Sequence, residues 1–213
     1  MTLSSRSILN TIISVSKTSS PGPAPAFTAV HVSRAILYIG DQGPIGRIEL
    51  SRKLGVGEGA VRTIVRHLTK AKLVDIAKGG CVLTQRGTTF YESLRSKLSE
   101  VRLVNARELA LDKASAAVLV RGSSKLVNRG IEQRDAAIRV GATGACTLIY
   151  KNGKLVMPMN ERENWNLQPH GSLFAELRKA FSPSNDDVIT IVSAPSQELA
   201  EHSAMAAALT LLG

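Results

Sequence analysis

The 213-residue chain contains only two cysteines, and none of its apolar runs approaches the ~20 residues that a membrane-spanning helix needs. Cys81 and Cys146 lie far apart in separate apolar runs, so they form neither a metal-binding nor a redox motif. The four histidines do not cluster with them, and the sequence has no HExxH motif or P-loop. We therefore expect no metal, no cofactor and no membrane segment. Because no catalytic set is recognisable either, we do not expect an enzyme.

Acidic residues are scarce in the first part of the chain, where none precedes Asp41. Residues 1–102 contain 15 Lys and Arg against 6 Asp and Glu, a net charge of +9, whereas residues 103–213 contain 12 against 11, a net charge of +1. Such asymmetry indicates that the first half binds a polyanion. Nucleic acid fits better than a membrane surface, because the basic half has no Trp-anchored amphipathic helix and the single Trp165 lies in the neutral half.

The length of the chain predicts two modest domains. A Ser- and Pro-rich stretch at residues 19–25 excludes helix and marks the first boundary. We expect a disordered or loosely ordered tail over residues 1–22 and a DNA-binding domain over residues 23–102. An α/β domain that binds an effector or dimerises is expected over residues 103–213.

The basic half has the pattern of a winged helix: three helices, a β-hairpin and a fourth helix. In that fold the second and third helices form the helix-turn-helix and the hairpin is the wing. The hairpin turn, Lys78-Gly79-Gly80, carries a positive charge. The predicted elements are helices at 30–39, 48–54, from Gly57 onward and from Gln85 to about Glu100, with strands at 73–77 and 81–84.

The predicted third helix has two different faces. At ~100° per residue, Val61, Ile64, Val65 and Leu68 share an apolar stripe, and a basic and polar face lies opposite. On an isolated helix such a face is usually only solvated, but the winged-helix context favours entry into the major groove. The predicted DNA-binding residues are Ser51, Arg52, Gly59, Arg62, Thr63, Arg66, Lys70 and Lys78.

The neutral half alternates strands and helices in the order β-α-β-β-α-β, with one more helix at the end. This order is typical of a ferredoxin-like α/β arrangement, so the fold class of the whole chain is α+β. The terminal helix is rich in alanine and could form a homodimer contact or pack on its own sheet. The predicted strands are 116–120, 146–150, 154–157 and 188–193, and the predicted helices are 125–140, 172–181 and 196–212.

In the predicted helix 125–140, Arg134 falls in the middle of the apolar face. A buried guanidinium must pair with an acid or with carbonyl groups, or bind an anionic effector, and we favour the structural pairing. The glycine-rich segment 141–145 could offer backbone N–H groups to an anion or simply form a tight turn. The candidate ligand-binding residues are Arg134, Asp135, Arg139, Thr143 and Gly144.

Several segments resemble an archaeal family of winged-helix proteins that carry an uncharacterised C-terminal domain. The resemblance covers most of residues 22–213 and implies an archaeal, cytoplasmic transcriptional regulator, without supplying a ligand, an operator or a catalytic residue. The matching segments are Gly22–Phe27, Gly46-Arg47, Gly57–Thr63, Leu83–Gly87, Gln133–Arg139, Gly141–Ala145 and Ala200–Leu209.

We therefore expect a transcriptional regulator that binds double-stranded DNA as a homodimer and whose second domain dimerises or senses an anionic small molecule. Two alternatives remain open. One is an enzyme with an appended regulatory winged helix, and the other is a winged-helix module for protein–protein interaction.

Overall fold

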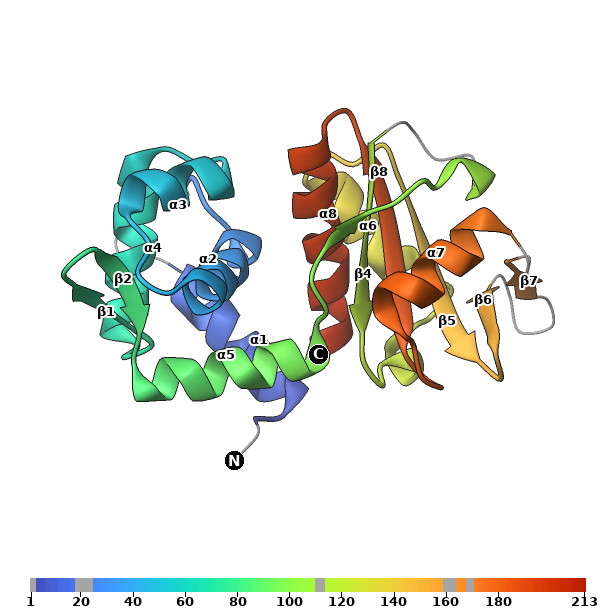
Figure 1. Ribbon diagram of the computed structural model, residues 1–213, viewed down its shortest axis with the longest axis horizontal. Coiled ribbons are helices and arrows are strands. Elements are labelled where there is room, and N and C mark those ends of the chain that lie inside the picture. Colours follow the sequence, from blue (N-terminus) through green and yellow to red (C-terminus); the bar gives the residue numbers. More distant parts are fainter. Residues whose placement is uncertain (1–2, 18–24, 110–113, 159–163, 168–170) are drawn as a thin grey trace. The chain divides into compact units, whose positions relative to one another are not determined.

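A computed structural model describes residues 3–17, 25–109, 114–158, 164–167 and 171–213. The chain forms two compact units, Met1–Arg95 and Ser96–Gly213 (Figure 1). Each unit has its own hydrophobic core and its own sheet.

The N-terminal unit contains the predicted series of three helices, a hairpin and a fourth helix, preceded by one more helix. Its elements are α1 (Ser5–Ser16), α2 (Ala29–Gln42), α3 (Arg47–Leu54), α4 (Glu58–Lys70), β1 (Val74–Ala77), β2 (Gly80–Leu83) and α5 (Gln85–Lys97). β1 and β2 pair antiparallel from Val74 opposite Leu83 to Ala77 opposite Gly80. Ile45 adds a bridge to Cys81, so a short segment before α3 extends the hairpin sheet.

The helix α1 lies within the expected loosely ordered tail over residues 1–22, of which residues 1–2 and 18–22 lie outside the described residues, and it shows that residues 5–16 are ordered. Ser4 caps its N-terminus by accepting a hydrogen bond from the Ser7 backbone N–H at 3.2 Å. Ile8, Ile12 and Val15, spaced by four and three residues, form a buried stripe that packs against α2 and α4. Such a stripe stabilises a helix only where another element covers it, and here α2 and α4 do so.

The helix α2 begins with a capping box. The Thr28 backbone N–H donates to Nδ1 of His31 at 3.0 Å. Burial, together with the charge of Arg34, lowers the pKa of His31 from 6.5 to about 4. The ring is therefore neutral at physiological pH, as an acceptor in this cap must be.

The helix α5 is held against the rest of the unit by close packing and by an ion pair. Gly87 lies directly against the Leu73 backbone. A side chain at this position would not fit, because a Cβ would overlap the Leu73 carbonyl oxygen. Asp41 of α2 accepts a hydrogen bond from the Tyr91 hydroxyl at 2.6 Å and forms an ion pair with Arg95. The first contact places the N-terminal end of α5 beside the segment that follows α4, and the contacts to Asp41 hold the later part of α5 against the end of α2.

The C-terminal unit is built around a six-stranded sheet in the order β3-β4-β8-β5-β6-β7, and every neighbouring pair is antiparallel. The strands are β3 (Arg102–Leu103), β4 (Ala114–Val120), β5 (Gly144–Lys151), β6 (Lys154–Pro158), β7 (Asn164–Asn166) and β8 (Val188–Ala194). The helices are α6 (Ile131–Arg139), α7 (Ser172–Phe181) and α8 (Gln197–Leu209), with 3-10 turns η1 (Arg107–Leu109), η2 (Ser124–Leu126) and η3 (Thr210–Leu212).

The strand order shows that the ferredoxin-like prediction is wrong, although the α+β class is correct. In a ferredoxin-like sheet the hairpin strand, here β6, would lie between β4 and β5, but β8 occupies that place. All seven residues of β8 are buried, whereas Leu155 alone is buried in β6. A strand that is apolar on both faces is most stable in the centre of a sheet covered on both sides. α6 and α8 cover one face and α7 the other (Figure 1).

The prediction of a buried Arg134 is also wrong. The helix α6 begins at Ile131, after η2 and a left-handed Gly130, rather than at Lys125. Its buried residues are Gln133 and Ala137, and the Arg134 side chain is 54% exposed and pairs with Asp135 at 3.3 Å. The shorter helix packs through Ala137 on α8, which turns the expected apolar face outward.

The alanines of α8 explain how closely the helices and the sheet approach each other. Ala200, Ala204 and Ala207 form a buried cluster with Ala137 of α6 and Val192 of β8. These alanines thus pack on the helix's own sheet, which was the alternative to a homodimer contact.

Candidate nucleic-acid interface

The candidate interface consists of α3, α4 and the β1–β2 hairpin of the N-terminal unit. The turn between the two helices is short: α3 ends at a left-handed Gly55, with a φ of 70°, and Gly57 is the N-cap of α4. Ser51 holds this turn, because its hydroxyl donates to the Val56 carbonyl oxygen at 2.5 Å. Figure 1 shows the hairpin beside α4, with which β1 is in contact.

The helix α4 carries the expected two faces. Val61, Ile64, Val65 and Leu68 are all buried. On the opposite face Arg62, Arg66 and Lys70 are exposed at intervals of four residues, about one helical turn apart. Within the part of the chain that the structure describes, none of these three side chains forms an ion pair or a hydrogen bond.

The other predicted DNA-binding residues differ from one another in exposure and in hydrogen bonding. Arg52 on α3 and Lys78 at the hairpin turn are exposed. Gly59 is exposed, and a Cβ there would have no neighbour within 4 Å. Thr63 is half-buried, and its hydroxyl donates to the Gly59 carbonyl oxygen at 3.1 Å. Its donor is thus engaged within the helix, as the Ser51 donor is at the turn.

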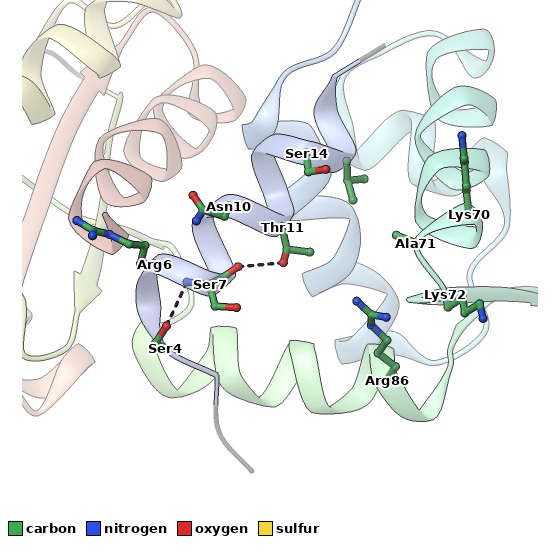
Figure 2. Close-up of a pocket in the computed structure, with 11 residues that line it drawn as sticks. Ser4, Arg6, Ser7, Asn10, Thr11, Ser14, Lys70, Ala71, Lys72 and Arg86 are labelled. Atoms are coloured by element: carbon green, nitrogen blue, oxygen red, sulfur yellow. Dashed lines mark hydrogen bonds between the residues drawn. The ribbon is translucent and has the colours of Figure 1, made fainter. Parts of the chain in front are cut away.

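Sequence reasoning missed a cleft in the same unit, between α1, the end of α4 and the start of α5 (Figure 2). Its volume is about 710 Å³. Four cationic side chains line it, from Arg6, Lys70, Lys72 and Arg86, and no acidic residue does. The absence of acids before Asp41, together with the buried stripe of α1, was the signal that could have indicated this cleft.

The candidate ligand-binding residues of the C-terminal unit do not form an enclosed site. Arg134, Asp135, Arg139 and Thr143 are exposed, and Arg134 pairs with its neighbour Asp135. Gly144 is the first residue of β5 and pairs with β8.

The glycine-rich segment after α6 is a turn rather than a set of free donors. The Gly141 N–H donates to the Ile138 carbonyl, and the Ala142 N–H donates to the Ala137 carbonyl. The Thr143 N–H and hydroxyl both donate to the Ser193 carbonyl, at 2.8 and 3.1 Å. These three backbone donors are therefore already used, as in the tight turn that was the alternative to an anion site.

The described residues contain no group of three or more His, Cys, Asp or Glu side chains that could hold a metal ion. Burial raises the pKa of the Cys146 thiol to about 12, and burial also raises the pKa of Cys81. Both thiols are thus kept in the unreactive protonated form. In the same part of the chain, no helix is both long and apolar enough to cross a membrane.

In comparisons with known proteins, the two halves of the chain match two different family models. Residues 34–98 match the family model described as the CggR N-terminal DNA binding domain. Residues 111–211 match a domain of unknown function, DUF4443.

Two curated relatives match about two fifths of this chain. The central glycolytic genes regulator of Bacillus subtilis (strain 168) is 33% identical over 90 residues, and that of Priestia megaterium is 34% identical over 90 residues. Each match covers 41% of this chain and 26% of the relative, so the chain matches about a quarter of the length of these regulators.

A solved structure resembles both halves. The hypothetical protein PH0730 from Pyrococcus horikoshii OT3 is 27% identical, with a TM-score of 0.67. The match covers 85% of this chain and 91% of that one. These findings confirm the expected resemblance, and the chain is one in which a CggR-like N-terminal DNA-binding domain is followed by a DUF4443 domain.

Proposed function

We propose that this protein is a cytoplasmic transcriptional regulator that reads double-stranded DNA with the exposed face of α4. The proposal rests on one observation: α4 has a buried aliphatic face and an exposed cationic face on opposite sides. The aliphatic face anchors α4 in the core, and Arg62, Arg66 and Lys70 project from the other face without ionic partners among the described residues. Unpaired arginines at one-turn spacing suit the major groove, where a bidentate contact to guanine gives ~1–3 kcal/mol of discrimination.

The remaining residues take supporting roles in this proposal. Arg52 and Lys78, exposed on α3 and at the hairpin turn, contact phosphates on the two sides of the groove. Gly59 lets the start of α4 approach the backbone closely. Ser51 acts indirectly, because its hydroxyl fixes the turn that sets the angle between α3 and α4.

The relatives support regulation rather than catalysis. The curated proteins that match 90 residues of this chain are regulators by name, and the family model that matches residues 34–98 is a DNA-binding domain.

The test is a comparison of two double variants on duplexes selected from a random pool. Arg62→Ala/Arg66→Ala removes two cations from α4, and Lys125→Ala/Lys154→Ala removes two exposed cations from the C-terminal unit as the matched control. Affinity is measured over a salt series. We expect the α4 variant to lose sequence selectivity and to lower the salt slope by roughly 0.9 for each lost phosphate contact, with the control unchanged. Unchanged affinity and slope in the α4 variant would show that α4 is not the reading face.

We further propose that the protein acts as a homodimer through its C-terminal unit, since helix-turn-helix proteins commonly occupy paired half-sites. The selected sequences test this directly, because a dimer yields inverted half-sites spaced by about one helical turn. A single unpaired half-site, together with a monomeric mass in solution, would rule the homodimer out.

We also propose that the C-terminal unit binds an anionic small-molecule effector. This proposal now rests on exposed side chains, Arg134 and Arg139, rather than on a buried guanidinium. Thermal unfolding with a panel of anionic metabolites compares the wild-type protein with Arg134→Ala. A stabilisation that the variant loses supports the site, and equal responses remove it.

A further inference from the structure

The cleft along α1 brings three cations together at a junction of helix ends. Lys70 is the last residue of α4, Lys72 follows two residues later, and Arg86 is the second residue of α5. All three are exposed, and none has an ionic partner among the described residues. In Figure 2 the Arg86 guanidinium points from α5 towards α1, whereas Arg6 points away from the other three.

Thr84 fixes the positions of two of these cations relative to each other. Its hydroxyl donates to the Lys72 carbonyl oxygen at 2.7 Å and accepts from the Gly87 backbone N–H at 3.0 Å. A single side chain therefore ties the end of α4 to the first turn of α5. The backbone segments that carry Lys72 and Arg86 are thereby held next to each other, and both side chains line the same cleft.

Both positions would be more stable with another type of residue. Lys72 has a φ of 58°, in the left-handed region that glycine or asparagine occupies most easily after a helix. Arg86 lies in the first turn of α5, where the helix dipole favours an acidic side chain over a basic one. The positive charge of Arg86 thus lies where the helix dipole disfavours it, which indicates that this charge has a function. At Lys72 only the backbone conformation is unfavourable, since the C-terminal end of α4 favours a cation.

The wall opposite these cations is formed by the polar face of α1. It presents Ser7, Asn10, Thr11 and Ser14, and no acidic residue lines the cleft. Arg, Lys, Ser, Thr and Asn side chains are the groups that contact phosphate oxygens in protein–DNA complexes. Sites for small molecules are instead enclosed and mostly apolar, whereas this cleft is open and lined by exposed polar side chains.

We propose that this cleft seats the phosphodiester backbone of the same duplex that α4 reads, so that α1 extends the DNA footprint. Lys70 belongs to both surfaces, since the series Arg62, Arg66 and Lys70 on α4 ends in the cleft. The inference rests on the proposed function in that it assumes a bound duplex. The effect expected for the cleft differs from that expected for base reading by α4, because phosphate contacts add affinity and salt dependence without adding sequence information.

The experiment uses the full chain with a selected duplex and a scrambled duplex, and affinity for each is measured over a salt series. Lys72→Ala/Arg86→Ala is compared with Lys125→Ala/Lys154→Ala, which removes the same charge from exposed sites of the C-terminal unit. Thermal unfolding checks that both variants fold. Lys72→Gln/Arg86→Gln serves as a second variant with longer side chains.

We expect the cleft variants to lower the salt slope by roughly 1.8, at 0.9 for each lost contact, and to keep the wild-type preference for selected over scrambled sequence. A slope equal to that of the wild-type protein overturns the inference. It is also overturned if inorganic phosphate or tripolyphosphate stabilises the wild-type protein but not the variant while the slope stays unchanged, because the cleft would then hold a small anion.

The Arg62→Ala/Arg66→Ala variant in the same series separates this inference from the proposed function. If that variant lowers the slope and the cleft variant does not, the inference alone fails. If the cleft variant alone lowers the slope, and the α4 variant keeps the wild-type affinity and sequence selectivity, the assignment of α4 fails and the cleft stands. Absence of any duplex binding by the wild-type protein overturns both.

Discussion

Replacing Ile12 by alanine is expected to destabilise the N-terminal unit strongly, because α1 is part of its core. The Ile12 side chain has no exposed surface. The substitution removes three carbon atoms, at about 0.8 kcal/mol each, and leaves a cavity that α2 and α4 can fill only in part. We expect a loss of about 2–4 kcal/mol in the free energy of unfolding.

The neighbouring Ile13 provides the matched control. It lies on the same helix but is only partly buried, so Ile13→Ala removes the same atoms from a position near solvent. Urea unfolding, followed by circular dichroism, measures both variants. We expect Ile13→Ala to cost less than half as much as Ile12→Ala. Equal and small losses would refute the packing of α1 and would restore the expectation of a loosely ordered tail.

The remaining predictions concern pH, packing and the corrected helix α6. Because the pKa of His31 in the folded protein is lowered to about 4, protonation favours the unfolded chain. Stability should fall as the pH drops from about 6.5 towards 4 and level off below, a loss on the order of 1 kcal/mol for this partly exposed ring. His31→Gln, which can keep the capping box, should lack that dependence in pH-dependent urea unfolding. Gly87→Ala should cost about 3 kcal/mol by steric overlap, while Gly59→Ala, with open space around it, should not destabilise, as thermal unfolding would show. Gln133→Ala should cost about 1 kcal/mol, since it breaks the part-buried hydrogen bond that the Gln133 amide donates to the Thr210 hydroxyl oxygen at 2.8 Å but also removes a buried Oε1 without a partner, whereas Arg134→Ala should stay within about 0.5 kcal/mol. The opposite order in urea unfolding would contradict the observed orientation of α6.

Local pattern was enough for the N-terminal unit wherever neighbouring residues interact with each other. The stripe Val61, Ile64, Val65 and Leu68 predicted both the existence and the buried face of α4. The turn at Lys78 predicted the hairpin, which the structure has in the expected place. These features depend on helical periodicity and turn chemistry within a few residues, so they can be derived from the sequence.

The sequence by itself determined the charge asymmetry, the order of the elements in the basic half and the two faces of α4, because each is a property of residues close together in the chain. Only the tertiary structure decided that β8 is central, that Arg134 faces solvent and that Lys72 and Arg86 lie together opposite α1. Each of these outcomes depends on which segments, far apart in sequence, pack against the same apolar surface. A pattern within a few residues does not contain that information.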